Sequence, residues 1–175
     1  MQKVKWFFVI TVLFFVTVSF LRPEKEKIRW ITVNELTQAY KKEPRPVIFD
    51  VYTDWCGWCK VMDKETYAKE KVAAYINQHY YAVKFNAEST ETVVFGGKKY
   101  GYNAANRSND FAGYLLFGQL SFPTTVFLSS LDARPSPLAG FLKPAELEAP
   151  LKYFGDGAYQ KQNFPEFMKT FKSNW

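Results

Sequence analysis

The sequence predicts an α/β fold with a mixed central sheet and helices on both faces of that sheet. Strand-like and helix-like segments alternate along most of the chain, and residues 47–52 are apolar except for one carboxylate, which is typical of a strand buried on both faces. The last two strand-like segments, 122–128 and one ending at Gly140, are close enough in sequence to pair as an antiparallel hairpin. This order of elements indicates one sheet with both parallel and antiparallel neighbours.

Local signals define the individual elements. Thr32 and Glu35 have the spacing of a capping box that opens a helix through about Lys42, and two prolines at 44 and 46 end it. Pro150 should kink the helix in which it falls or delay its start. The expected strands are 28–31, 47–52, 80–86, 122–128 and one ending at Gly140. Helical sequence runs from the Cys56–Cys59 motif through Met62 and, after a break near Thr66, continues over 69–78. Further helices are expected over 109–119, 144–154 (with Gly155 as its stop) and 165–171. A hairpin over 93–100 closes at Gly96-Gly97.

Length and composition limit the class of protein. The 175 residues suffice for one domain and a leader, and 47% hydrophobic with 19% aromatic residues exclude global disorder. The net charge of +6 comes from Lys and Arg residues scattered among acidic ones. Such a surface argues against a nucleic-acid-binding stripe, so we expect no nucleic-acid partner.

The N-terminus resembles a targeting segment. A short basic stretch, 1–5, precedes the apolar run 6–21, whose sixteen residues would cover about 24 Å as a helix, against a hydrocarbon core of roughly 30 Å. This length favours a signal peptide, although a small-residue cleavage site is poorly developed. We expect export, with the domain outside the cytoplasm (periplasmic), and membrane attachment through residues 6–21 stays open. The expected division is a leader at 1–21, a linker at 22–27, the main domain at 28–155 and a C-terminal extension at 156–175.

The two cysteines, Cys56 and Cys59, occur in the run Trp55-Cys56-Gly57-Trp58-Cys59-Lys60. Two thiols cannot form a framework of several disulfides. With only one histidine in the chain, they also provide too few ligands for a structural zinc site, so we expect neither a metal nor a cofactor. At the start of a helix, unpaired N–H groups favour an anion and lower the pKa of the leading thiol, Cys56. Cys59 would then resolve the mixed disulfide. The motif predicts a redox-active dithiol.

Asp50 and Lys84 are candidates to assist this chemistry. As an edge carboxylate, Asp50 would be exposed to water; if buried, it would have a raised pKa and could accept a proton from Cys59. Lys84, on a neighbouring strand, is either its ion partner or an exposed lysine. Trp55 and Trp58 either pack under the helix or offer a contact surface to substrate.

Together these residues resemble the thioredoxin superfamily, specifically exported thioredoxin-like proteins with a Trp-Cys-Gly-Trp-Cys-Lys motif. The resemblance covers 28–154 and is carried by the strand 47–50 leading into that motif, by Lys84-Phe85-Asn86, by Phe122-Pro123-Thr124 and by Gly140. It implies a thioredoxin fold, Cys56 as attacking thiol, Cys59 as resolving thiol, Asp50 as buried acid and Lys84 as its neighbour. It also implies a cis bond before Pro123, with the Phe122 backbone pairing with an extended substrate. The substrate-binding residues would be Trp55, Gly57, Trp58, Phe122, Pro123 and Thr124.

The chain departs from cytoplasmic thioredoxin at Trp58, which replaces a proline, and in extra residues within 88–120 and beyond Gly155. The best-supported function is a thiol–disulfide oxidoreductase that reduces disulfides of extracytoplasmic proteins. Its partners would be protein thiols or disulfides and an upstream electron donor. The alternatives are a disulfide oxidase or isomerase, a non-catalytic binding module of the envelope, and transient binding of a metal such as copper by the two thiolates.

Overall fold

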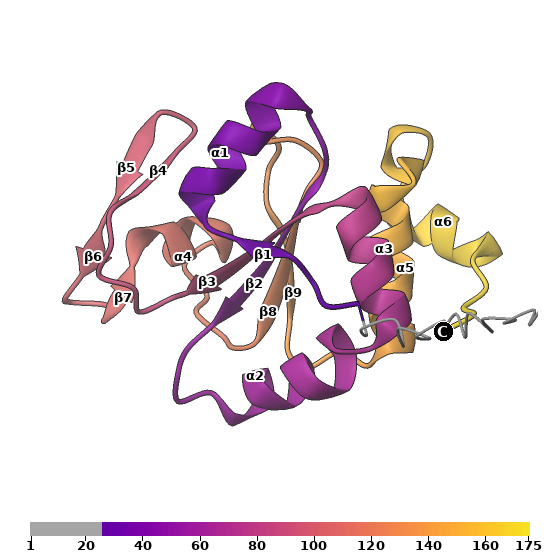
Figure 1. Cartoon of the computed structure of the whole chain (residues 1–175), viewed down its shortest axis with the longest axis horizontal. Coiled ribbons are helices and arrows are strands. Elements are labelled where there is room, and N and C mark those ends of the chain that lie inside the picture. The colour runs from indigo at the N-terminus through magenta and orange to yellow at the C-terminus, as the bar shows by residue number, and fades with distance from the viewer. Residues whose placement is uncertain (1–25) are drawn as a thin grey trace, which may run out of the picture.

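The computed structural model describes residues 26–175 and has the mixed α/β architecture that the sequence predicts (Figure 1). Five strands form the sheet in the order β1-β3-β2-β8-β9. Strands β1 and β2 both run parallel to β3, whereas β8 is antiparallel to β2 and to β9. The strands are β1 (Trp30–Ile31), β2 (Val47–Tyr52), β3 (Tyr81–Asn86), β8 (Thr124–Leu128) and β9 (Ser136–Ala139).

Helices surround this sheet. The first, α1 (Val33–Lys42), begins with the predicted capping box: Thr32 Oγ1 accepts the Glu35 N–H at 3.2 Å, and Glu35 Oε2 accepts the Thr32 N–H at 2.7 Å. The other helical elements are α2 (Gly57–Met62), the π-helical turn η1 (Asp63–Tyr67), α3 (Glu70–His79), α4 (Asp110–Leu115), α5 (Pro144–Gly155), the 3₁₀ turn η2 (Ala158–Gln160) and α6 (Phe164–Thr170).

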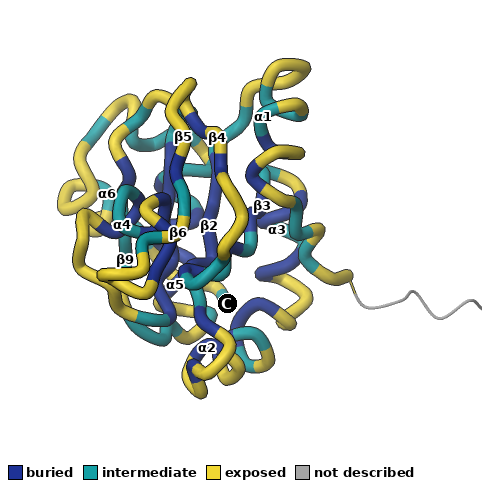
Figure 2. Tube along the Cα trace, turned by 90° about the vertical axis from the view of Figure 1, so that its left-hand side faces the viewer, coloured by how far each residue is buried: buried dark blue, intermediate teal, exposed yellow. Residues whose placement is uncertain are grey.

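The two faces of the sheet carry separate hydrophobic clusters because side chains alternate along each strand. On β2, Phe49 points to the cluster under α1 and α4, whereas Ile48 points to the cluster under η1, α3 and α5. Figure 2 shows β2 buried at the centre of the molecule. By the same alternation, Asp50 shares the face of Ile48, which is the face covered by the helix that follows the cysteines.

The segment 88–120 extends the fold beyond the central sheet. The hairpin of β4 (Val93–Phe95) and β5 (Lys98–Tyr100) confirms the prediction, with Gly96 and Gly97 at φ of +57° and +75° in its turn. A second small ladder, β6 (Tyr102–Asn103) with β7 (Ser108–Asn109), was not predicted. The helix expected to reach residue 119 is wrong in length: α4 ends at Leu115 because Phe117 and Gly118 adopt left-handed conformations, with φ of 53° and 75°.

Two expectations about helix continuity concern Thr66 and Pro150. The break expected near Thr66 lies at Ala68 and Lys69, just before α3, because the helix first continues through η1, where the Ala68 N–H reaches the Asp63 carbonyl at 2.9 Å. Pro150 does not delay α5, which begins at Pro144. Pro150 lies inside this helix, beyond its first turn, and the buried side chains of Leu147 and Leu151 hold α5 against the sheet despite the lost backbone hydrogen bond.

The residues after Gly155 fold back onto α5 and α3. Their anchor is Glu148 on α5, a carboxylate with an exposed fraction of 0%. Its Oε2 accepts bonds from Ser173 Oγ at 2.5 Å and from the backbone N–H groups of Asn174 and Trp175 at 2.9 and 3.2 Å. Lys152 Nζ lies 2.7 Å from Oε1. The C-terminal segment is therefore part of the folded unit.

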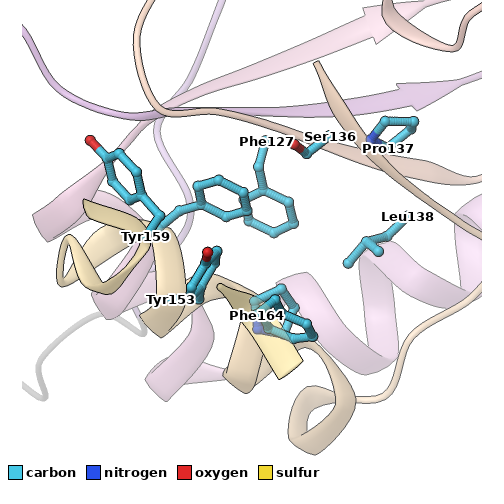
Figure 3. A pocket seen from close by; sticks show the side chains of 9 residues that line it. Phe127, Ser136, Pro137, Leu138, Tyr153, Tyr159 and Phe164 are labelled. Atoms are coloured by element: carbon cyan, nitrogen blue, oxygen red, sulfur yellow. The ribbon is translucent and has the colours of Figure 1, made fainter. Parts of the chain in front are cut away.

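An apolar cavity of about 360 Å³ opens beside the edge strand β9, which contains Pro137 (Figure 3). Leu138 lines it from the sheet, and Tyr153 and Phe164 line it from α5 and α6. None of the residues that line it belongs to the Trp55–Lys60 run. Within residues 26–175, no helix is long and apolar enough to cross a membrane, and the expected leader lies outside these described residues.

Candidate active site

The two cysteines lie where the end of β2 passes into α2. Cys56 is the N-cap of α2, and its Sγ accepts the Cys59 N–H at 3.0 Å. The two residues form a disulfide with their Cα atoms 5.3 Å apart, and both are buried. The described chain is thus the oxidised form of the dithiol, at the helix start that the sequence predicts.

Asp50, on β2 six residues before Cys56, is buried, with an exposed fraction of 2%. Its Oδ2 lies 2.9 Å from Lys84 Nζ, and its Oδ1 has no hydrogen-bond partner in the structure. Burial raises the pKa of Asp50 from 3.8 to about 6, an effect that Lys84 reduces and the charge of Asp63 increases. The expectation of an ion pair with Lys84 is confirmed, and the alternative of an exposed edge carboxylate is wrong.

Asp63 is a third charged residue of the site that the sequence interpretation missed. Lys84 Nζ contacts both Asp63 Oδ1 and Asp50 Oδ2. Burial alone would lower the pKa of Lys84, but the two carboxylates raise it. The sequence spacing could have identified Asp63, because this residue follows Cys59 by four positions and so falls on the same side of the helix.

Two rings complete the surroundings of Lys84. Its Nζ lies 5.4 Å from the ring centroid of Trp30 and 5.1 Å from that of Tyr52. Cation–π contacts of this kind restrict a lysine that would otherwise sample many rotamers. The ammonium is therefore held between one buried carboxylate, one half-exposed carboxylate and two aromatic faces.

The loop before β8, which contains Pro123, is the next part of the site. The Phe122–Pro123 peptide bond is cis, as the resemblance implies. Thr124 is buried, and its Oγ1 donates to the Ser121 carbonyl at 2.8 Å. The Pro123 carbonyl accepts the Gly140 N–H at 2.8 Å. These contacts join the proline loop to the end of β9.

Both tryptophans of the motif are exposed rather than packed under the helix, at 67% for Trp55 and 63% for Trp58. The Trp55 ring meets Phe122 edge-on at 6.0 Å between centroids, and its Nε1 donates to Glu88 Oε1 at 3.0 Å. The Trp58 ring lies 5.7 Å from that of Phe141, which the sequence interpretation did not single out. Gly57 opens α2 between them, with no neighbouring atom within 4 Å of the position that a Cβ would occupy.

The single histidine and the acidic side chains do not form a metal site in the described residues. His79 ends α3 and stacks on Tyr75 with ring centroids 4.2 Å apart. Across residues 26–175, no group of three or more His, Cys, Asp or Glu side chains is arranged to hold a metal ion.

Comparison with known proteins finds one family model and one relative that are similar to parts of this chain. A family model, Thioredox_DsbH, described as "Protein of unknown function, DUF255", matches residues 13–97. The thiol:disulfide interchange protein DsbD of Pectobacterium atrosepticum is 27% identical over 124 residues, which are 70% of this chain and 18% of DsbD. The chain therefore spans about a fifth of that relative's length.

Solved structures agree on the fold. A thioredoxin-fold protein from Helicobacter pylori superposes with a TM-score of 0.55 and 16% identity, covering 84% of each chain. A DsbH oxidoreductase superposes with a TM-score of 0.54 and 17% identity, covering 79% of this chain and 92% of the other. The sheet and its flanking helices are those of the thioredoxin fold.

Proposed function

We propose that this chain, a thioredoxin-like thiol–disulfide oxidoreductase with a domain of the DsbD and DsbH type, works as a reductase of protein disulfides outside the cytoplasm. The observation that carries the proposal is the buried Asp50 on β2, with one oxygen paired to Lys84 and one oxygen free, behind a CxxC disulfide.

The reaction would begin with the reduced dithiol. The Cys56 thiolate attacks one sulfur of the substrate disulfide, the first substrate thiolate leaves, and a mixed disulfide forms. Cys59 then loses its proton to Asp50 and attacks the Cys56 sulfur. This step expels the second substrate thiolate, which takes up a proton from Asp50 or water, and forms the Cys56–Cys59 disulfide. Two electrons pass to the substrate, and an upstream dithiol donor must return them.

Asp50 suits the role of proton acceptor for a physical reason. A base with an ordinary aspartate pKa would be a poor acceptor from a thiol, whereas a pKa of about 6 brings the carboxylate closer to the working pH. Lys84 contacts both Asp50 and Asp63, and Asp63 lies on the helix that follows the cysteines. These contacts hold the proton acceptor, Asp50, in a fixed position relative to that helix.

Electrostatics favour reduction as the direction. A strong oxidant needs a reduced form stabilised as thiolate, for which an adjacent cation is the usual means. In this motif the residues between the cysteines are Gly57 and Trp58, and the ammonium of Lys84 is occupied by two carboxylates. Negative charge from Asp50 and Asp63 would disfavour the thiolate, so the disulfide should be a weak oxidant.

The compartment is a separate part of the proposal and depends on the leader at 1–21. Fusing the full chain to alkaline phosphatase, which is active only after export, tests it: activity of the fusion supports export, and an inactive but well-expressed fusion contradicts it.

The direction is tested by the reduction potential of the full chain, measured in glutathione or dithiothreitol buffers, with an insulin-reduction assay. We expect a potential in the range of thioredoxin, roughly −270 mV, and catalysis that Cys56→Ser abolishes. A potential near that of the strong oxidant DsbA, roughly −120 mV, would reject the direction. Equal activity of Cys56→Ser would reject the mechanism, and trapping with Cys59→Ser would identify substrates as mixed disulfides.

A further inference from the structure

Phe141 occupies a defined position beside the redox motif. It follows Gly140, which has a φ of +95°, in the loop after β9. Its ring is half-buried against the cluster that contains Ile48 and Leu147, and it meets the ring of Trp58 at 5.7 Å with an interplanar angle of 36°. The largest exposed side chain next to Cys59 is therefore in contact with a ring from another segment of the chain.

Both neighbours of Phe141 are tied to other parts of the site. Before it, the Gly140 N–H donates to the carbonyl of Pro123 at 2.8 Å. After it, the Leu142 carbonyl accepts from Thr66 Oγ1 at 2.5 Å, and Thr66 lies in η1, the continuation of the redox helix. Phe141 thus cannot move independently of the proline loop or of the helix, and it limits the positions that the Trp58 ring can adopt.

We propose that the Trp58–Phe141 pair is a specificity-determining wall of the active site, which selects disulfides whose cysteine is flanked by a large apolar side chain. The inference rests on the proposed function and adds to it a preference among substrates. Its basis is the exposure of Trp58, a neighbour of Cys59 in sequence: this residue has an exposed fraction of 63%, although its ring already contacts that of Phe141.

The physical reason is the free energy gained when a substrate side chain buries the exposed area of the Trp58 and Phe141 rings. A substrate that places an aromatic or long aliphatic side chain over the pair removes apolar area of both partners from water, and aromatic contacts add to that gain. Because Phe141 fixes the ring in advance, little side-chain entropy is lost on contact. A substrate with a small polar residue at this place obtains the same sulfur chemistry without the gain.

The experiment uses the reduced full chain and two disulfide-bonded peptides of identical sequence, except that the residues next to one cysteine are Phe in one peptide and Ser in the other. The quantity measured is the ratio of kcat/KM for the Phe peptide to that for the Ser peptide. We expect a ratio of about 10 for wild type, which corresponds to about 1.4 kcal/mol, and a fall to about 2 or below for Phe141→Ala and for Trp58→Ala.

Two controls separate recognition from structure. Phe164→Ala removes an aromatic ring of similar size on α6, away from the motif, and should keep the wild-type ratio. Phe141→Tyr should restore the ratio that Phe141→Ala loses, and the reduction potential of Phe141→Ala should equal that of wild type.

The outcomes are distinct. Equal kcat/KM for the two peptides in wild type, or an unchanged ratio in Phe141→Ala, overturns the specificity role. A shifted potential with equal losses on both peptides also overturns it, because Phe141 would then act on the cysteines. Failure of the proposed function would look different: Cys56→Ser would reduce both peptides as fast as wild type.

Discussion

Asp50 and Lys84 face each other across neighbouring parallel strands, paired in register between β2 and β3, with 2.9 Å between Oδ2 and Nζ. The contact is made at the Asp50 oxygen that has a partner, while the other oxygen is buried without one. This half-satisfied pair is costly to bury and chemically useful, and the first three predictions follow from it.

Asp50→Asn should stabilise the protein at alkaline pH. The folded-state pKa of Asp50, about 6, lies above its ordinary value of 3.8, so the native state binds more protons in this window and stability falls as pH rises from about 4 to 6. Removing the buried charge should raise the free energy of unfolding at pH 8 by about 1–3 kcal/mol. Urea unfolding at pH 8 and pH 4 measures this; a gain of the same size at pH 4 would contradict the explanation.

The same substitution should slow catalysis. If Asp50 accepts the Cys59 proton, Asp50→Asn should lower the rate of substrate release from the mixed disulfide by roughly 10–100-fold at pH 7. The wild-type pH–rate profile should have an inflection near pH 6 that the variant lacks. Stopped-flow tryptophan fluorescence can follow the step. Asp132→Asn, which neutralises an exposed turn carboxylate, is the matched control and should leave the profile as in wild type.

Substitutions of Asp63 and Lys84 should move the pKa of Asp50 in opposite directions. The charge of Asp63 raises this pKa and that of Lys84 lowers it. Asp63→Asn should therefore bring the pKa of Asp50 below about 6, and Lys84→Gln should raise it above that value. Carboxyl ¹³C chemical shifts of Asp50 against pH report both changes, and shifts of the same sign would show that the charges are not coupled as described.

Glu148→Ala should destabilise the fold without touching the redox chemistry. It leaves Lys152 without its carboxylate partner and three donors of residues 173–175 without an acceptor. Loss of one member of a buried ion pair typically costs about 3 kcal/mol or more, reduced here by the partial exposure of Lys152 to about 2–3 kcal/mol. Chemical denaturation tests the value. Glu166→Ala, at an exposed carboxylate of α6, should change stability little.

The sequence was sufficient for features with a local cause. The strand at 47–52, the Thr32–Glu35 capping box and the Gly96-Gly97 turn each depend on side chains within a few residues of one another. The redox motif is equally local, since the dithiol needs only a strand end and a helix start. The cis bond at Pro123 was implied by the resemblance rather than by the residues alone.

Features that depend on distant contacts were missed. Asp63 gains its place at the site only because Lys84, on another strand, reaches it. Phe141 and Glu148 are unremarkable in sequence, and their contacts with Trp58 and with residues 173–175 arise from packing. The end of α4 was misjudged because left-handed conformations at Phe117 and Gly118 outweighed the helix-forming leucines before them.

The edge strand β9 has a consequence for how the protein meets other chains. Among residues 26–175 no strand pairs with its outer side, and Pro137 within it lacks a backbone N–H and has a fixed φ. Such an edge is a poor template for another strand, which protects against edge-to-edge aggregation. An extended partner would then find its backbone hydrogen bonds at the proline loop, next to the sulfurs, and not along the open side of the sheet.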